Sequence, residues 1–448
     1  MNFMNRIKAS LITVCLWALA WSALGQGGAS DRAAVAKRIG AEYPSLFSLY
    51  KYLHAHPELS FMEKNTADRI AAELRDAGLK VTQHVGGHGV VGVLKNGAGP
   101  TVLVRCDLDG LPVKENTGLP FASKHRMKDE QGNEVFTMHA CGHDIHMTSF
   151  VGTARVLAGM KERWKGTLVM IGQPAEERGG GAKAMLADKL FERFPLPDYC
   201  VALHVSSAMP AGMVGYAEGY ALANVDSVDI KIFGVGGHGA YPQATKDPVM
   251  LAAQTIVALQ TIVSREIAPI EPAVVTVGSI HGGTKHNVIP EEVDLQLTVR
   301  SYSDETRNKL LNAIKRIARG QAISAGLPED KMPIVTVKDE YTPSTYNDPT
   351  LTRRLVKTFG EWLGEGNAVK RQPVMGGEDF GRYGRTKHKV PIFMFWLGAV
   401  SPESVKRSIA TGGTLPSLHS SIFAPEAEPT IKTGVTAMSA AVLELMGN

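Results

Sequence analysis

The sequence contains little of what would place it among disulfide-stabilised, nucleic-acid-binding or membrane-embedded proteins. Only four cysteines occur in 448 residues, and Cys15 lies in an apolar run near the N-terminus. The odd number beyond that run, Cys106, Cys141 and Cys200, argues against a disulfide framework and leaves at least one thiol for other chemistry. The 48 basic residues nearly balance the 44 acidic ones. The net charge of +4 therefore gives no electrostatic case for nucleic acid or an anionic surface.

The apolar run near the N-terminus, Leu11–Leu19, is short for a membrane span, which needs about 20 residues. Arg6 and Lys8 precede it, and the small-x-small sequence Ala23-Leu24-Gly25 follows it. This order is typical of a secretory signal peptide. We therefore expect residues 1–25 to be cleaved and the mature protein to be periplasmic or secreted, without a stable membrane span. A retained membrane anchor is the alternative.

The length exceeds that of one ordinary core and predicts two domains or one large domain. Helical spacing of apolar residues predicts helices between Asp31 and Gly78, and Met147–Lys161 has the length of a crossover helix. Continuous apolar runs are typical of strands in a sheet that helices cover on both faces, which predicts an α/β fold. Four such runs occur: 101–104, 168–171, 200–203 and 392–396.

The pattern changes between about Val225 and Asp339. Residues 225–232 alternate as a half-buried strand does, and the predicted elements that follow are a helix at 248–264, strands at 274–280 and 293–300, a helix at 304–325 and a strand at 334–338. This order is that of a ferredoxin-like α+β unit. We expect residues 223–340 to be an inserted domain, with the catalytic domain in two parts, 31–222 and 341–448.

The segment His139–His146 concentrates three imidazoles, one thiol and one carboxylate in eight residues. Cysteine, histidine and carboxylate side chains are ligands for borderline-soft metal ions. Gly142 allows a backbone turn through which Cys141 and His143 can converge. This segment alone leaves a metal site and a polar loop equally open.

Further metal-competent groups follow other predicted strands. Asp107 ends the first apolar run, Glu176-Glu177 follow the second, and His204 ends the third. The carboxyl ends of strands in an open α/β sheet border the ligand crevice, so these groups should share one edge. His204 and the late His419 could complete a ligand set, and one of the two glutamates could bind metal while the other takes a proton from water. Asp107, Asp144 and His146 could orient the ligands.

Seven segments together resemble the aminoacylase, hippurate hydrolase and indoleacetyl-amino-acid hydrolase group of metal-dependent amidohydrolases, relatives of dinuclear zinc carboxypeptidases. They run in family order along nearly the whole mature chain: 56–60, 105–112, 138–146, 173–177, 236–240, 287–290 and 375–380. The resemblance implies a zinc-carboxypeptidase-like mixed sheet flanked by helices, with a ferredoxin-like lid or dimerisation domain. It also implies hydrolysis of the amide bond of N-acyl amino acids or related small conjugates by a metal-activated water.

The resemblance also assigns roles to residues. It implies that Cys141, His143, Glu177, His204 and His419 bind two divalent ions, zinc above all, with manganese, cobalt and nickel also compatible. Glu176 falls on the general base, and Asp107 is counted with the catalytic residues. His238 falls on a histidine that the smaller domain offers to the substrate carbonyl, in some relatives across a dimer, and Asn287 on a substrate-binding residue. The protein is expected to be a homodimer or a monomer.

Three features depart from the pattern or bear on specificity. Ile145 replaces a small residue within the metal-binding segment. Ser123–Thr137 is longer and more charged than is typical and is expected near the site entrance. Arg105 stands where wider relatives have a metal-binding histidine, although the closer subgroup also has arginine.

Two other classes of function compete with the hydrolase. A thiol enzyme would use Cys141 with His143 as its base, but it would not need Glu176-Glu177. A non-catalytic metal- or peptide-binding protein should lack a ligand or the base, and none is missing. Sensitivity to chelators separates the metal-dependent hydrolase from the thiol enzyme.

Overall fold

The computed structural model describes the backbone of residues 4–447 and the side chains of residues 30–447. The predicted signal peptide, residues 1–25, lies outside the residues whose side chains are described and stays a prediction. Across the described part of the chain, no helix has both the length and the apolar character that a bilayer span requires.

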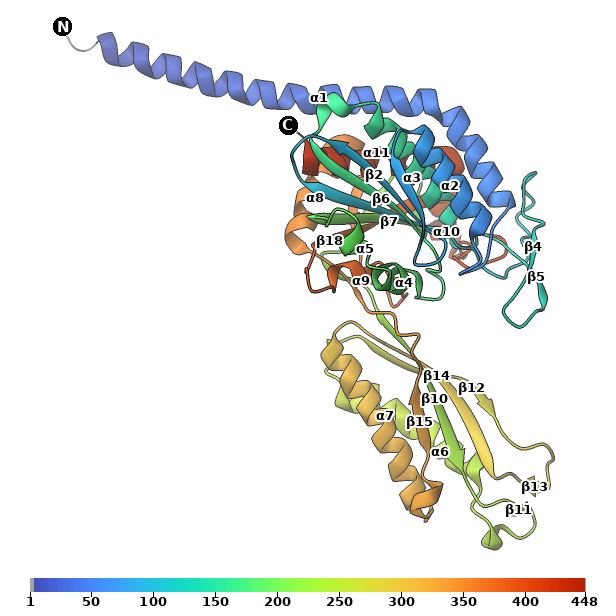
Figure 1. The fold of residues 1–448 in the computed structure, drawn as a ribbon. Coiled ribbons are helices and arrows are strands. Elements are labelled where there is room, and N and C mark those ends of the chain that lie inside the picture. The colour runs from blue at the N-terminus through green and yellow to red at the C-terminus, as the bar shows by residue number, and fades with distance from the viewer. Residues whose placement is uncertain (1–3, 448) are drawn as a thin grey trace.

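One mixed sheet of eight strands forms the larger unit (Figure 1). Its strands are, in sheet order, β1 (Lys80–Val85), β2 (Gly89–Asn96), β6 (Gly166–Gln173), β3 (Thr101–Asp107), β7 (Tyr199–Pro210), β18 (Ile392–Val400), β8 (Val214–Tyr216) and β17 (Ala368–Lys370). The central strands β6, β3, β7 and β18 are parallel, whereas β1, β2 and β8 add antiparallel pairs. The four predicted apolar runs are these four central strands, so the predicted α/β sheet is confirmed.

Helices cover both faces of this sheet, which explains why its central strands are apolar throughout. Successive residues of β3 point to opposite sides: Val102 and Val104 belong to one hydrophobic core and Leu103 to the other. The first core is closed by α1 (Met4–Ala55), α2 (Lys64–Asp76), α3 (His143–Ala158), α8 (Pro349–Leu363) and α11 (Ala427–Met446). The second is closed by α4 (Gly181–Ala187), α5 (Leu190–Arg193) and α9 (Gly381–Gly384).

A second, antiparallel sheet forms the smaller unit, in the order β12-β14-β10-β15. Along the chain its elements are β10 (Asn224–Phe233), α6 (Pro248–Thr261), β12 (Ala273–His281), β14 (Glu292–Ser301), α7 (Asp304–Ser324) and β15 (Ile334–Val337). Both helices pack on one face, where Val228, Ile230 and Ile232 of β10 are fully buried. Side chains of the same strand that point the other way are only half-buried, which is why its sequence alternates.

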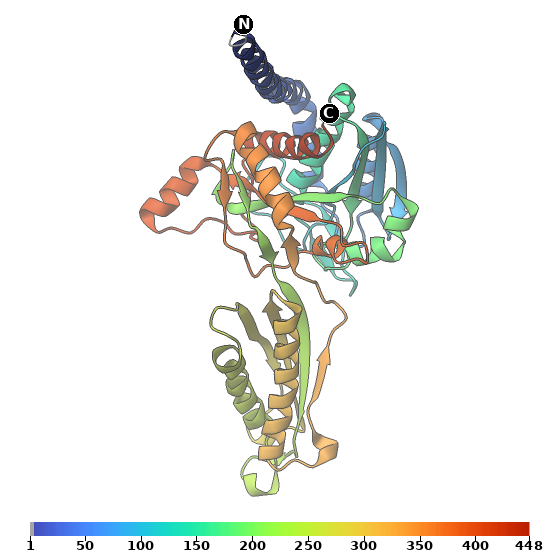
Figure 2. The same ribbon diagram turned by 90° about the vertical axis from the view of Figure 1, so that its left-hand side faces the viewer.

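The smaller unit projects from the larger one (Figures 1 and 2). The chain enters the smaller unit at β10 and returns to the larger unit through the segment after β15, and the two units meet at this crossing. Val225 and Thr342 exchange backbone hydrogen bonds at this crossing. Arg385 of the larger unit forms an ion pair with Asp304 at the start of α7. Val225 and Thr342 line the same cavity as Glu176, which follows β6, and His204 of β7.

One predicted boundary near the site is wrong. The crossover helix was expected to begin at Met147, but α3 begins at His143. Gly142, with a φ of 76°, supplies the left-handed turn from which the helix starts. His143, Asp144 and His146 therefore occupy the first turn of a helix rather than a loop. The sequence offered no usual N-cap side chain to mark this start.

Candidate metal centre

A tight turn before α3 brings Cys141 and His143 to the edge of the sheet. A side chain at Gly142 would lie 2.5 Å from a methyl group of Val205, and the φ of 76° is one that other residues rarely adopt. Glycine is therefore required for the turn both sterically and conformationally. His204 reaches the same place from β7.

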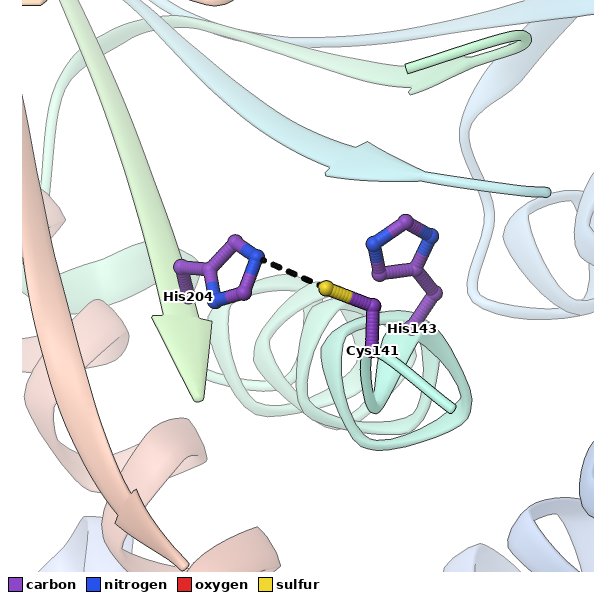
Figure 3. Close-up of side chains that lie close together, drawn as sticks. All are labelled: Cys141, His143 and His204. Atoms are coloured by element: carbon purple, nitrogen blue, oxygen red, sulfur yellow. Dashed lines mark hydrogen bonds between the residues drawn. The ribbon is translucent and has the colours of Figure 1, made fainter. Parts of the chain in front are cut away.

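Two sets of three potential ligands share the Cys141 thiol. One set is Cys141, His143 and His204, and the other is Cys141, Glu177 and His419; within each set the ligand atoms lie within 4.8 Å of one another. In the first, Cys141 Sγ lies 3.5 Å from His204 Nε2, and His143 stands on its other side (Figure 3). A thiolate shared by the two sets could serve two neighbouring ions.

Backbone carbonyls fix the orientation of two of the histidines. His143 Nδ1 donates to the carbonyl of Asp109 at 2.8 Å, and His204 Nδ1 donates to the carbonyl of Val205 at 2.8 Å. Because a carbonyl can only accept, the neutral form of each ring carries its hydrogen on Nδ1 and leaves the lone pair of Nε2 for a metal ion. Metal-binding histidines are commonly held in this way.

The unsatisfied atoms of the cluster fit a metal ion. His143 Nε2 and Glu177 Oε1 are buried, and neither has a hydrogen-bond partner within the part of the chain that is described. Buried polar atoms normally have partners, so such a pair side by side needs an explanation. A soft thiolate with imidazole and carboxylate suits zinc and its transition-metal neighbours.

Glu176 and Glu177 point toward different histidines, and they follow a constrained stretch of backbone. Ala175 adopts a φ of 49°, unusual for a non-glycine residue, and its N–H is held by the Glu63 carboxylate at 2.7 Å. Glu177 Oε2 lies 3.4 Å from His419 Nε2, whereas Glu176 Oε2 lies 3.9 Å from His143 Nε2. Glu177 thus belongs to the set with Cys141 and His419, whereas Glu176 belongs to neither of the two sets that share Cys141.

Charge and burial act against one another in the cluster. Burial alone would lower the pKa of His143, but Asp107, Asp109 and Glu177 raise it to about 10. Burial raises the pKa of Glu177 to about 7 against the opposing charge of His143. Burial, with the nearby Glu177 and Glu176, raises the pKa of the Cys141 thiol well above its usual value. This environment disfavours a free thiolate nucleophile, which needs a lowered pKa.

Arg105 does not serve as a metal ligand but holds acidic side chains of the cluster in place through hydrogen bonds. Its guanidinium is fully buried and donates to Asp107 Oδ2 and Glu378 Oε1, each at 2.8 Å, and to Gln173 at 3.1 Å. A further contact reaches Asp379 at 3.4 Å. Glu378 and Asp379 come from a segment more than 270 residues away, so this network joins the two halves of the larger unit.

The residues predicted to orient the ligands lie around the cluster. Asp107 accepts from His146 Nδ1 at 2.7 Å, and His146 Nε2 accepts from the Val205 N–H at 2.9 Å, so both nitrogens of His146 are occupied. Asp144 Oδ2 accepts from His54 Nδ1 at 2.7 Å. Glu115 holds the other nitrogen of His54 at 3.0 Å.

His238 and Asn287 do not reach the cluster in this chain. His238 lies in β11 (Gly237–His238), which pairs with β13 (Val288–Ile289), and the Gly239 N–H donates to the Asn287 carbonyl at 2.9 Å. This pair of strands lies at the end of the smaller unit farthest from the eight-stranded sheet (Figure 1). Both residues are exposed.

A cavity of about 650 Å³ opens from the cluster between the two units. Cys141, Glu176 and His419 line it on one side, and Ser227 and Arg300 on the other. Its volume is in the range of small-molecule sites. The fold and the site together fit a hydrolase whose candidate metal ligands gather at one edge of an α/β sheet.

Comparisons with known proteins agree with this class. Residues 103–411 match the model of peptidase family M20/M25/M40. Thermostable carboxypeptidase 1 of Saccharolobus solfataricus is 34% identical over 396 residues, 88% of this chain and 93% of the relative. Hippurate hydrolase of Campylobacter jejuni is 38% identical over 334 residues, 73% of this chain and 82% of the relative.

A crystal structure from Bacillus subtilis, described as a dinuclear metal-binding peptidase from the M20 family, has a TM-score of 0.72 and 29% identity. The match covers 91% of this chain and all of that one. The chain belongs to peptidase family M20/M25/M40. It is a metal-dependent hydrolase of amide bonds, as the motifs predicted.

Two contributions to the site were not recognised in the sequence. Asp109 binds Ser60 and the Glu177 N–H at 2.6 and 3.0 Å, and its position two residues after Asp107 at a strand end could have indicated it. Arg300 lines the cavity from β14, but one arginine in an alternating strand carries no sequence signal.

Metal affinity should rise with pH between about 6 and 8. His143, Glu177 and Cys141 hold protons at neutral pH because their pKa values are raised to about 10, to about 7 and well above the usual thiol value. Since a bound ion must displace those protons, binding releases them and is weaker at low pH. Titration calorimetry of metal-free protein in two buffers of different ionisation enthalpy measures both effects. Affinity independent of pH would contradict these protonation states.

Replacing Arg105 should destabilise the fold severely. Arg105→Met leaves buried Asp107 and Glu378 without their cation, at a cost of about 3–5 kcal/mol in the free energy of unfolding. Arg319→Met, which removes an exposed pair with Glu329, is the control and should cost less than about 1 kcal/mol. Urea denaturation at equal metal content compares them. Equal stabilities would show that the network is not needed to join the two halves.

Proposed function

We propose that this enzyme hydrolyses the amide bond of N-acyl amino acids or related small conjugates, using two divalent ions that two ligand sets sharing Cys141 would hold. The observation that carries the proposal is the pair of ligand sets that share this one thiol. The relative named hippurate hydrolase supports the substrate class. We expect zinc, with manganese, cobalt and nickel compatible with the same donors.

The residues divide the chemistry among them. One ion would be held by Cys141, His143 and His204, and the other by Cys141, Glu177 and His419. When bound, the ions supply a water of lowered pKa and polarise the amide carbonyl. Glu176 takes the proton of that water and returns it to the departing amine. Burial and the neighbouring Glu378, Glu177 and Asp379 raise the pKa of Glu176 well above its usual value. A raised pKa makes the carboxylate a stronger base, which supports its role as the proton acceptor.

Arg300 is suited to bind the carboxylate of the amino acid. Its guanidinium donates to Thr298 Oγ1 at 2.9 Å and to the carbonyl of Met375 at 3.3 Å, both uncharged acceptors. No ion pair of Arg300 occurs among the described residues. Because these partners are uncharged, Arg300 is available to bind the carboxylate of a substrate in the cavity.

His238 is suited to donate to the substrate carbonyl oxygen from a second copy of the chain. The Ala240 N–H donates to His238 Nδ1 at 3.0 Å, so Nε2 carries the hydrogen and can donate. Its distance from the cluster in Figure 1 favours supply across a dimer over supply within one chain. Asn287 lies beside it and would contact the same substrate.

Two further features support a dimer of the smaller units. β12 is an edge strand with an open side, and α6 exposes Met250 and Val257. Unpaired edges and exposed apolar side chains are features that association covers. We also propose export with cleavage of residues 1–25, on the sequence pattern alone.

Substitution of Glu176 and of Glu177, one at a time, should show which of them is the general base and which is a metal ligand. Metal-loaded wild-type protein should release the amine from a panel of N-acyl amino acids, and chelation should stop it. Glu176→Gln should keep both ions and lower kcat by about 10²–10⁴-fold, because an amide cannot accept the proton. Glu177→Gln should also lose metal. Elemental analysis and turnover are measured on the same samples. Wild-type kcat in Glu176→Gln would refute the assignment.

His238→Ala should lower kcat by about 100-fold or more while metal content stays intact, because one donor to the carbonyl oxygen is lost. Mixing this variant with Glu176→Gln should restore activity above the sum of the two. The mixed dimer would pair an intact metal site in one chain with an intact His238 from the other. Absence of restoration after verified subunit exchange would argue against supply across the dimer.

A further inference from the structure

The segment that departs most from the family pattern forms a hairpin in a fixed position. β4 (Arg126–Lys128) pairs with β5 (Glu134–Phe136), and the hairpin extends beside the larger unit (Figure 1). At its base, His125 and Thr137 both bind the carbonyl of Pro57, at 3.0 and 2.7 Å. At its tip, the Asp129 carboxylate accepts from two backbone N–H groups, at 3.0 and 2.8 Å.

The tip of this hairpin reaches the wall of the cavity. Glu130 forms an ion pair with Arg178, which directly follows the predicted ligand Glu177 and lines the cavity. The two side chains are 47% and 45% exposed, so the pair stands at the mouth rather than in the interior. The hairpin thus supplies the acidic partner of a cavity residue.

The two arginines among the described cavity-lining residues differ in their partners. Arg178 is paired with Glu130, and the pair raises the pKa of Arg178. Glu340, on the segment that returns from the smaller unit, lines the same cavity and adds a weaker attraction to Arg178. Arg300 has uncharged partners. One arginine is therefore available to a substrate carboxylate and the other is neutralised.

We infer that the hairpin sets the charge that the enzyme accepts in its substrate. Glu130 neutralises Arg178, so Arg300 alone receives a carboxylate, and the site favours substrates with one carboxylate over those with two. A second carboxylate would have to displace Glu130 from Arg178. This inference rests on the proposed function, because it concerns the amino-acid part of an N-acyl amino acid.

The test compares two substrates of nearly equal shape that differ in charge. N-acyl-glutamate and N-acyl-glutamine are assayed with the acyl group that the metal-loaded wild-type enzyme turns over best, and the ratio of their kcat/KM values is recorded. Glu130→Gln frees Arg178 and should raise the glutamate-to-glutamine ratio about two- to fivefold, the range expected for one exposed ion pair. The gain should disappear in 1 M salt, where charges are screened beyond about 3 Å.

Matched variants separate this effect from a change in hairpin structure. Glu134→Gln removes the hairpin's second glutamate, which pairs with Arg126, and should leave the ratio unchanged. Glu130→Gln/Arg178→Gln should return the ratio to the wild-type value or below it. Glu130→Gln/Glu340→Gln removes the alternative partner of Arg178 and should raise the ratio at least as much as Glu130→Gln does.

Two results would overturn the inference, and they have different meanings. An unchanged ratio in both Glu130→Gln and Glu130→Gln/Glu340→Gln, with wild-type turnover and metal content, would contradict the role of the hairpin alone. No hydrolysis of any N-acyl amino acid by metal-loaded wild-type protein would contradict the proposed function itself.

Discussion

The structure depends on burying an excess of acidic groups at one edge of a sheet. Six acidic side chains lie in this region: Asp107, Asp109, Glu176, Glu177, Glu378 and Asp379. The guanidinium of Arg105 forms ion pairs with three of them, Asp107, Glu378 and Asp379. Burial raises the pKa of Asp379 to about 7 even though Arg105 opposes the shift. Buried carboxylates without enough positive charge are unfavourable, so the remaining charge calls for a cation from outside the chain.

The parallel strands explain why this excess is concentrated in one place. β3, β6 and β7 all end at the same edge, and each ends in or leads to a polar residue of the cluster. Gly142 and Ala175 provide the two left-handed backbone turns that aim Cys141 and Glu176-Glu177 inward. The arginine network below ties this edge to the segment at 378–379, so the geometry of the cluster depends on both halves of the larger unit.

Much of the fold and the cluster could be predicted from sequence because the relevant signals are local. Four central strands are apolar throughout since both of their faces are covered, and most of the candidate ligands lie in short motifs of chemically distinctive residues. The edge strand β1 was not recognised because its half-buried residues are mostly polar. The start of α3 was misplaced because glycine, rather than a capping side chain, begins it. Arg300 and the Glu130–Arg178 pair depend on contacts between distant segments, which no local pattern reveals.

The central claim is that Cys141 belongs to the ligand sets of two ions. X-ray absorption spectroscopy of the metal-loaded protein, combined with elemental analysis, tests it most directly. We expect two ions per chain, sulfur bound to both, and a metal–metal separation of about 3.5–4 Å. A single ion per chain, or two ions of which one has no sulfur ligand, would contradict a centre bridged by Cys141.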